Sequence, residues 1–289
     1  MYESFYGLTE KPFSILPDPD FLYWGEAHSM AFAMLEYGVL NQAGFTVITG
    51  DIGCGKTTLV RYLLRSVPQD VSVGMVTNTR HNPGDLLHWI MMSFGQPFDG
   101  LSYVALYQKF QQFLIDEYAA GRRTVLIIDE AQNLSMESLE ELRMLSNINA
   151  DKEQLIQLIL VGQPQLKDLL QRPELIQFGQ RVSSDFHLRP LEAEDAVPYI
   201  DHRLYAAGAR EALFSRNACA MIYQASRGIP RTINILCDTA LIYGFSSGAK
   251  KITTHIVKAV IEDKQRYGLF KLQQPPALQV VGGRENEAQ

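Results

Sequence analysis

Residues 50–57 combine glycines, a lysine and a hydroxyl group in the order G-x-x-x-x-G-K-[ST]. Glycines in this order let backbone N–H groups curl around a phosphate, while the lysine compensates the charge of the β- and γ-phosphates. An apolar run at 45–49 precedes this phosphate loop and a helix-like stretch at 58–65 follows it, which is the order that such a loop requires. The pattern therefore predicts binding of a nucleoside triphosphate. The residues expected to contact it are Gly50, Asp51, Ile52, Gly53, Cys54, Gly55, Lys56, Thr57 and Thr58.

Two carboxylates, Asp129 and Glu130, follow a second apolar run at 124–128. Consecutive apolar residues are typical of a strand buried on both faces of a parallel sheet, so the two acids are expected at the carboxyl end of that strand. Thr57 and Asp129 are then placed to hold Mg²⁺, Asp129 through water. Glu130 is placed to orient or deprotonate an attacking water.

Strand-like and helical patterns alternate from residue 45 to about residue 188. The expected strands are 45–49, 71–78, 124–128, 154–161 and 181–188, and the expected helices are 83–94, 103–120 and 135–147. Alternation of this kind predicts right-handed βαβ units and a parallel sheet covered on both faces, which is the three-layer α/β fold of a P-loop NTPase. After Pro190 only helices are expected, at 192–207, 215–225, 229–243 and 254–267. These would form a small all-helical domain.

The first 44 residues are rich in aromatic residues and prolines and include a helical stretch at 28–41. Disordered segments are poor in aromatic residues, so we expect an arm that packs on the domain surface. Contact with the nucleotide base and plain packing are both open as its role. The predicted parts are 1–44, arm and helix; 45–190, ATPase core; 191–268, helical domain; and 269–289, a flexible tail without periodicity.

Composition limits the class of protein. A net charge of −6 over 289 residues argues against sequence-blind nucleic-acid binding, although it is compatible with a local basic patch. The three cysteines have no C-x-x-C spacing, which predicts reduced thiols in a cytosolic compartment. Within the phosphate loop, Cys54 is either a small filler or a partly activated thiolate. The sequence has no signal-peptide pattern and no run of eighteen apolar residues, so we expect a cytoplasmic protein without a membrane span.

A phosphate-loop core followed by a small helical lid resembles the layout of the AAA+ ATPases. In that resemblance Gln163, at the end of the apolar run 158–161, looks like the first sensor, and Arg231 in the sequence 226–231 looks like the second sensor of the G-x-P-R type. Arg181 resembles the arginine finger that reaches the site of a neighbouring subunit, with Arg172 and Arg189 as alternatives. The resemblance thus implies ATP and Mg²⁺ as cofactors, a homo-oligomer, and Glu130, Gln163, Arg181 and Arg231 as catalytic residues.

A narrower resemblance rests on several short segments. The stretches 2–13, 17–23, 35–38, 129–134 and 161–166, together with His28, are similar to the general secretion pathway A-type, or ExeA-like, group. The match covers residues 1 to about 267. Some members continue into a membrane helix and a peptidoglycan-binding domain, whereas shorter members are associated with exosortase and exopolysaccharide loci. This chain resembles a short form or the cytoplasmic part of a longer one.

The resemblance implies an ATP-hydrolysing switch or motor that drives or regulates assembly of a bacterial secretion or exopolysaccharide and envelope system, and that reaches the inner membrane through partners. One alternative is an ATP-dependent DNA-binding regulator of the transposition target-selection type. Its basic residues, Arg61, Arg65, Arg80, Arg122 and Arg123, are scattered in the sequence. Another alternative is a nucleotide-dependent scaffold that turns ATP over very slowly.

Overall fold

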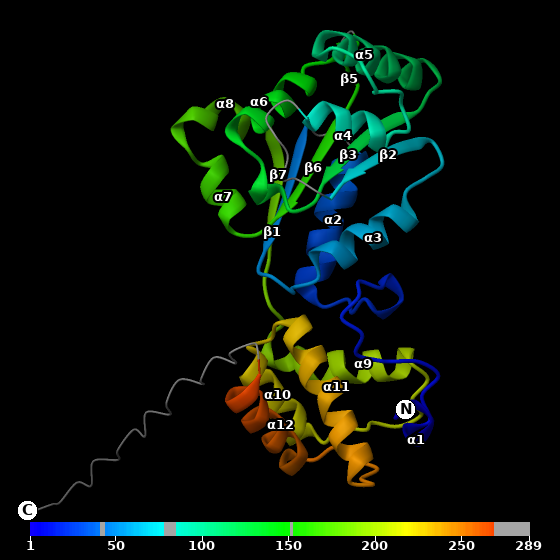
Figure 1. Cartoon of the computed structure of the whole chain (residues 1–289), viewed down its shortest axis with the longest axis vertical. Coiled ribbons are helices and arrows are strands. Elements are labelled where there is room, and N and C mark those ends of the chain that lie inside the picture. Colours follow the sequence, from blue (N-terminus) through cyan, green and yellow to red (C-terminus); the bar gives the residue numbers. More distant parts are fainter. Residues whose placement is uncertain (41–43, 78–84, 151–152, 269–289) are drawn as a thin grey trace, which may run out of the picture.

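The computed structural model describes residues 1–40, 44–77, 85–150 and 153–268, which form two lobes (Figure 1). A parallel sheet with flanking helices makes up the upper lobe in Figure 1, and helices make up the lower lobe. The predicted flexible tail, 269–289, lies outside the described residues. So do the predicted end of a strand at residue 78 and the predicted start of a helix at residues 83 and 84.

The sheet has five parallel strands in the order β2-β3-β6-β1-β7. The strands are β1 (Phe45–Gly50), β2 (Val71–Val76), β3 (Arg123–Ile128), β6 (Gln157–Gly162) and β7 (Val182–Leu188). Every residue of β1 and β6 is buried, as expected for central strands of a sheet covered on both faces. The predicted P-loop NTPase sheet is confirmed.

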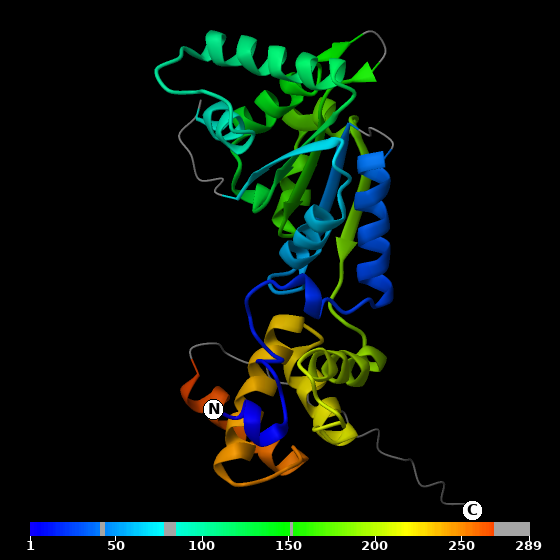
Figure 2. The ribbon, with the colours of Figure 1, turned by 90° about the vertical axis from the view of Figure 1, so that its right-hand side faces the viewer.

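Helices cover both faces of this sheet (Figure 2). On one face lie α2 (Glu26–Leu40) and α3 (Lys56–Ser66); on the other lie α4 (Leu86–Ser93), α5 (Tyr103–Ala119) and α6 (Met136–Leu145). The short elements η2 (Ala131–Asn133), α7 (Gln165–Leu170), η3 (Pro173–Leu175) and α8 (Ile176–Gly179) connect strands on this second face. Serine side chains begin two of the helices: Ser102 accepts from the backbone N–H of Ala105, and Ser135 from that of Ser138.

The chain departs from the predicted strand at 154–161. Here β5 (Glu153–Gln154) pairs antiparallel with β4 (Asn149–Ala150), and β6 begins only at Gln157. Leu155 and Ile156, between β5 and β6, are buried in the core although they belong to neither strand. An apolar run in the sequence indicates that its residues are buried but does not indicate their hydrogen-bond partners. The sequence therefore could not predict the break between β5 and β6.

The second lobe contains η4 (Ala193–Asp195), α9 (Ala196–Ala206), α10 (Arg216–Ser226), α11 (Pro230–Ser246) and α12 (Thr254–Tyr267). The arm, with α1 (Glu3–Tyr6) and η1 (Pro19–Phe21), contributes Tyr2, Tyr6, Phe13 and Phe21 to the buried core of this lobe. In contrast, α2 packs on the sheet through residues such as Leu35. Residues 2–21 therefore pack with the helical lobe, and the helix that follows them packs with the other.

Candidate nucleotide-binding site

The phosphate loop follows the carboxyl end of β1. Its conformation requires glycine at two positions, because Gly53 has φ +88° and Gly55 has φ +99°. A Cβ at Gly53 would lie 2.7 Å from Cβ of Arg231. The side chain of Lys56 is buried and donates from Nζ to the carbonyl oxygens of Gly50 at 2.6 Å and of Asp51 at 3.0 Å. Burial lowers the pKa of Lys56. A phosphate bound in the loop would provide a negatively charged partner for this ammonium group, which here donates to neutral carbonyl oxygens.

The predicted magnesium ligands meet at this end of the sheet. Thr57 Oγ1 donates to Asp129 Oδ2 at 3.0 Å, and the backbone N–H of Glu130 donates to Asp129 Oδ1 at 2.9 Å. Asp129 is buried, and this burial raises the pKa of its carboxyl group. A hydroxyl and a carboxylate oxygen are the hard ligands that Mg²⁺ takes, so the residues present fit this ion.

Glu130 is held in an unusual position. Its backbone has φ 55° and ψ 35°, a left-handed conformation that residues other than glycine rarely adopt. Residues held in such a conformation cluster at functional sites. Glu130 Oε2 accepts from Nε2 of Gln132 at 2.6 Å and from Nε2 of Gln163 at 3.2 Å. In turn, Gln132 Oε1 accepts from the backbone N–H of Gln163 at 2.9 Å. The structure therefore brings the predicted base and the predicted first sensor together and adds Gln132 as a link between them.

Arg231 lies across from the phosphate loop at the start of α11. Its backbone N–H donates to the carbonyl oxygen of Gly53 at 3.1 Å, which joins the helical lobe to the loop. Its exposed side chain lines the same cavity as Lys56, Glu130 and Gln163. Arg231 thus lines the cavity that the phosphate loop also lines.

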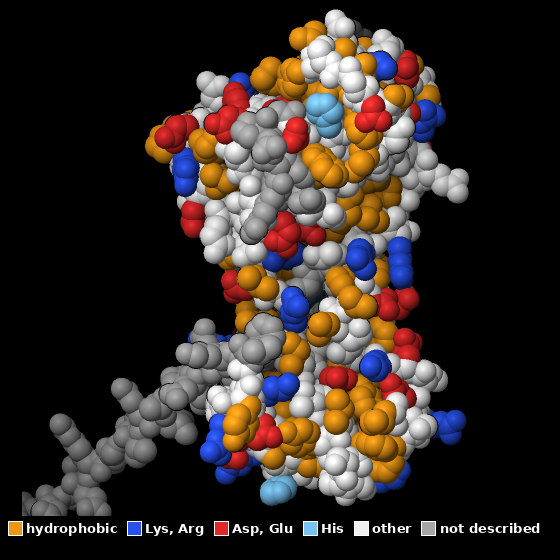
Figure 3. All heavy atoms as spheres, viewed as in Figure 1, with side chains coloured by type: hydrophobic (Ala, Val, Ile, Leu, Met, Phe, Trp, Pro, Cys, Tyr) orange, Lys and Arg blue, Asp and Glu red, His pale blue; other side chains and the backbone are white. Residues whose placement is uncertain are grey.

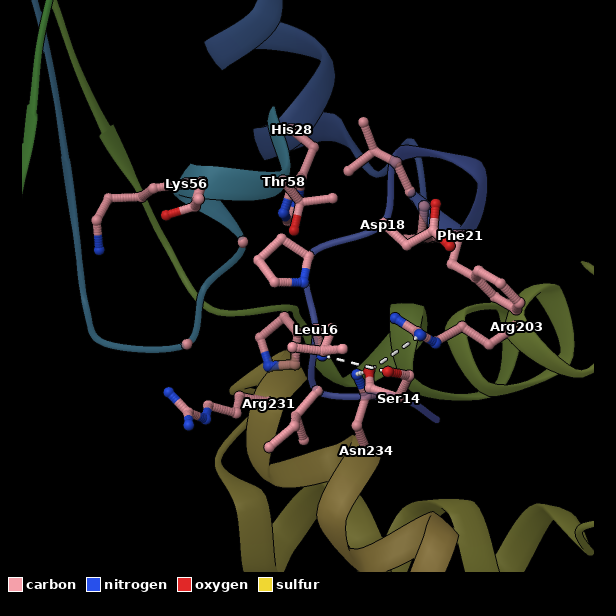
Figure 4. Close-up of a pocket in the computed structure, with 18 of the residues that line it drawn as sticks. Ser14, Leu16, Asp18, Phe21, His28, Lys56, Thr58, Arg203, Arg231 and Asn234 are labelled. Carbon is pink, nitrogen blue, oxygen red and sulfur yellow. Dashed lines mark hydrogen bonds between the residues drawn. The ribbon is translucent and has the colours of Figure 1, made fainter. Parts of the chain in front are cut away.

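A cavity of about 230 Å³ opens between the phosphate loop, the arm and the helical lobe (Figure 4). The arm contributes residues 14–18 and 21–23, and the helical lobe contributes Tyr199, Arg203 and Asn234 besides Arg231. The arm therefore packs on the helical lobe and lines the cavity as well. Figure 3 shows both Lys or Arg and Asp or Glu side chains around the narrow part between the lobes.

A buried histidine contacts the phosphate loop, and the cysteine within the loop is itself buried. His28 Nε2 lies 3.0 Å from the carbonyl oxygen of Cys54; since a carbonyl only accepts, this nitrogen carries the proton. Burial lowers the pKa of His28, which keeps the ring neutral. Burial raises the pKa of the Cys54 thiol to about 11, so the geometry favours the small filler over the activated thiolate. The sequence drew attention to His28 through a resemblance and gave no sign of this contact.

Arg181 lies at the other end of the sheet. Strand pairing sets Phe45 beside Val182 and Gly50 beside Leu188, so Arg181 is on the order of 20 Å along the strands from the phosphate loop. Its guanidinium donates to Ser146 Oγ at 3.1 Å. Arg181 therefore does not reach the cavity of its own chain, and its role towards a neighbouring subunit stays a prediction. The alternatives Arg172 and Arg189 are exposed.

Comparison with known proteins places this chain in a family. The AAA domain family matches residues 39–170. Over 255 residues, 87% of this chain, the sequence is 41% identical to General secretion pathway protein A of Aeromonas hydrophila. The chain belongs to the AAA+ proteins of the general secretion pathway A type. It spans 46% of the length of that relative.

Solved structures share the fold of this AAA+ protein at low sequence identity. The ORC2 protein of Aeropyrum pernix, solved as ADPNP–ADP complexes, superposes with a TM-score of 0.66 at 18% identity over 88% of this chain and 71% of that one. Cdc6p of Pyrobaculum aerophilum gives 0.67 at 17% identity over 86% and 69%. The RuvB motor of Thermotoga maritima gives 0.56 at 19% identity over 86% and 73%. The AAA+ fold class, with its helical C-terminal region, is thereby confirmed.

The AAA+ protein has no helix, among its described residues, with both the length and the apolar character that crossing a membrane requires.

Proposed function

We propose that this AAA+ protein binds ATP with Mg²⁺ and hydrolyses it to ADP and phosphate. The observation that carries the proposal is the convergence of Lys56, Thr57, Asp129 and Glu130 at the carboxyl ends of β1 and β3, beside the cavity. A loop of backbone N–H groups, a buried ammonium, a hydroxyl next to a carboxylate, and a second carboxylate are the groups that phosphoryl transfer to water needs.

Each group has a proposed role. Thr57 and Asp129 would hold Mg²⁺, which when bound neutralises charge on the phosphates. Glu130 accepts the proton of the attacking water, and its bonds to Gln132 and Gln163 hold the carboxylate oriented. Arg231 and Gln163 contact the γ-phosphate end of the nucleotide, Arg231 from the helical lobe.

The biological role is proposed at the level of the family. We propose that the protein forms a homo-oligomer in which Arg181 serves the neighbouring site, and that turnover drives or regulates assembly of a bacterial secretion or exopolysaccharide and envelope system. The 41% identity to General secretion pathway protein A supports this proposal. A cytoplasmic location, with the inner membrane reached through partners, belongs to the same proposal. The likeness to ORC2, Cdc6p and RuvB is one of fold and carries no argument for DNA.

We also propose residues 45–190 as the ATPase core and residues 191–268 as its lid, with residues 2–13 of the arm grouped with the lid. The packing of Tyr6 and Phe13 in the core of the helical lobe supports this grouping.

The test is to compare the wild-type protein with Lys56→Ala. Calorimetry should detect ATP binding by the wild type, and phosphate release should depend on Mg²⁺. Lys56→Ala should lose tight binding, because the substitution removes the ammonium group that would compensate the charge of the β- and γ-phosphates. Unchanged ATP affinity in Lys56→Ala would overturn the proposed site. Arg210→Met, an exposed arginine in α9's neighbouring turn, serves as the control.

A further inference from the structure

Arg203 of α9 is a buried arginine that has no carboxylate partner among the residues that the structure describes. Arg203 is only 7% exposed. Nε donates to the carbonyl oxygen of Pro12 at 2.6 Å, Nη2 to that of Ser14 at 3.3 Å, and Nη1 to the hydroxyl of Tyr199 at 3.4 Å. The guanidinium carbon also lies 4.9 Å from the centre of the Phe21 ring. The charge of Arg203 is thus directed at the backbone of the arm.

Desolvating a guanidinium is costly, so a side chain that only fills space here would be better apolar. The planar fork of arginine offers what an apolar group cannot, because its fixed donors reach two carbonyl oxygens at once. A lysine ammonium is a point charge on a flexible stem and does not reproduce this geometry. The Ser14 carbonyl also accepts from Asn234 Nδ2 at 3.5 Å, so two helices of the lobe, α9 and α11, hold the same point of the arm (Figure 4).

The segment held in this way crosses the cavity. Pro12 and Phe13 are buried, but the next residues, Ile15 and Leu16, are 53% and 74% exposed and line the cavity. Ile52 of the phosphate loop, 61% exposed, lines it as well. Apolar side chains open to a cavity beside a phosphate site suit the flat, largely apolar face of a purine base.

The other end of the segment is tied to the helix that follows the phosphate loop. Arg61 of α3 donates from Nη1 to the carbonyl oxygen of Pro17 at 2.8 Å, and Arg65 of α3 pairs with Asp20 at 2.7 Å. Arg65 and Asp20 are both exposed, so this pair contributes little by itself. The Arg61 bond to Pro17 is exposed too, whereas the Arg203 bond to Pro12 is buried and that to Ser14 is partly buried, so Arg203 is the more shielded of the two anchors of segment 14–18.

We propose that Arg203 is a positioning residue for nucleotide binding: by holding the carbonyls of Pro12 and Ser14, it fixes segment 14–18 as the wall against which the base of the bound nucleotide packs. The inference rests on the proposed function and names a residue beyond the phosphate loop and sensors. Because Arg203 belongs to α9, a base packed on the arm also holds the helical lobe.

Two variants, Arg203→Lys and Arg203→Met, test the proposal, with Arg210→Met as the matched control. Lysine keeps the charge and the aliphatic stem, and methionine keeps only an apolar stem, so an effect in both reports the lost fork. Calorimetry should give ATP affinity weaker by about tenfold in each variant, the equivalent of one lost hydrogen bond of ordinary strength. The control should bind ATP as the wild type does.

Hydrogen exchange at saturating ATP separates positioning from general loss of structure. In the wild type, ATP should protect amides of residues 13–23 and of the phosphate loop. In both Arg203 variants the protection of the loop should remain while that of residues 13–23 is lost. Thermal unfolding should show whether each variant is folded. If Arg203→Met does not fold, Arg203→Lys alone provides the test.

Three results would overturn the inference: unchanged ATP affinity in both variants, full protection of residues 13–23, or loss of protection in the loop and the arm together. A wild-type protein that bound no ATP would instead overturn the proposed function itself. Wild-type binding combined with unaffected Arg203 variants would leave the proposed function intact and remove only Arg203 from it.

Discussion

Replacing Gln132 by alanine should lower ATP turnover and leave ATP affinity nearly unchanged. The Gln132 carboxamide donates to Glu130 Oε2 at 2.6 Å and accepts from the backbone N–H of Gln163 at 2.9 Å. Alanine removes both bonds. Of these two glutamines, only Gln163 then still donates to the Glu130 carboxylate, over the longer distance of 3.2 Å. The proposed base would lose the shorter of its bonds to these two glutamines.

The magnitude follows from the charge on the acceptor. A hydrogen bond to an ionised group contributes about 1.5–3 kcal/mol. A change of about 1.4 kcal/mol in the barrier alters a rate tenfold, so kcat should fall by about 10- to 100-fold if the bond persists into the transition state. Gln132 is not among the residues that line the cavity. The Kd for ATP should therefore change by less than about threefold.

The assay is phosphate release at saturating ATP and Mg²⁺, combined with calorimetric measurement of the Kd. Gln177→Ala, which changes an exposed glutamine of α8, is the matched control and should behave as the wild type. A kcat within twofold of the wild type in Gln132→Ala would refute the reasoning, because the link would then have no part in orienting Glu130. A Kd that rises in step with the fall in kcat would refute it too, since that pattern indicates damage to the whole site.

Three further predictions concern the same site. Glu130→Gln keeps the shape of the carboxylate but cannot take up a proton, so ATP binding should persist while phosphate release falls on the order of 10²-fold; wild-type turnover would place the base elsewhere. Burial raises the pKa of the Asp129 carboxyl group in the folded protein. The contribution of this group to the free energy of unfolding is therefore largest at low pH, where it is protonated, and is lost as the pH rises through the folded-state pKa. Asp129→Asn should therefore raise the Tm of the nucleotide-free protein at pH 7 and abolish Mg²⁺-dependent turnover, and an unchanged or lower Tm would contradict this sign. Mixing Arg181→Ala chains with Lys56→Ala chains should restore some ATP turnover, because mixed assemblies contain interfaces that pair an intact ATP site with an intact finger. A finger of this kind raises kcat by roughly 10³-fold. Co-assembled subunits without recovery of turnover would exclude Arg181 as the finger.

Much of the arrangement of the candidate site could be predicted from the sequence because the residues concerned lie in short continuous segments. The phosphate loop is one continuous segment whose glycines, lysine and hydroxyl stand at fixed offsets, and the two positive φ angles fall on Gly53 and Gly55. Strand β3 could be predicted from an apolar run that is followed directly by Asp129 and Glu130. Parallel strands place their carboxyl ends at one edge, so the meeting of Thr57 with Asp129, 72 residues apart, could be anticipated without coordinates.

Boundaries and strand pairing were less accessible. The run 154–161 looked like one strand, yet the structure pairs its start antiparallel with β4 and begins β6 at Gln157. The short helices α7 and α8 also have no clear signal in the sequence. Hydrogen-bond partners come from other parts of the chain, so periodicity within a segment cannot name them.

The sequence by itself thus determined the kind of scaffold and which residues are candidates for the chemistry. The tertiary structure alone decided which distant groups hold them in place. Arg203 bonds to Pro12 across 191 residues, and Arg61 bonds to Pro17 across 44. These contacts join the arm, the lid and the phosphate-loop helix around one cavity. They involve backbone carbonyls, which every residue carries, so no residue type in the arm signals them. Only the path of the folded chain brings those carbonyls to the arginines.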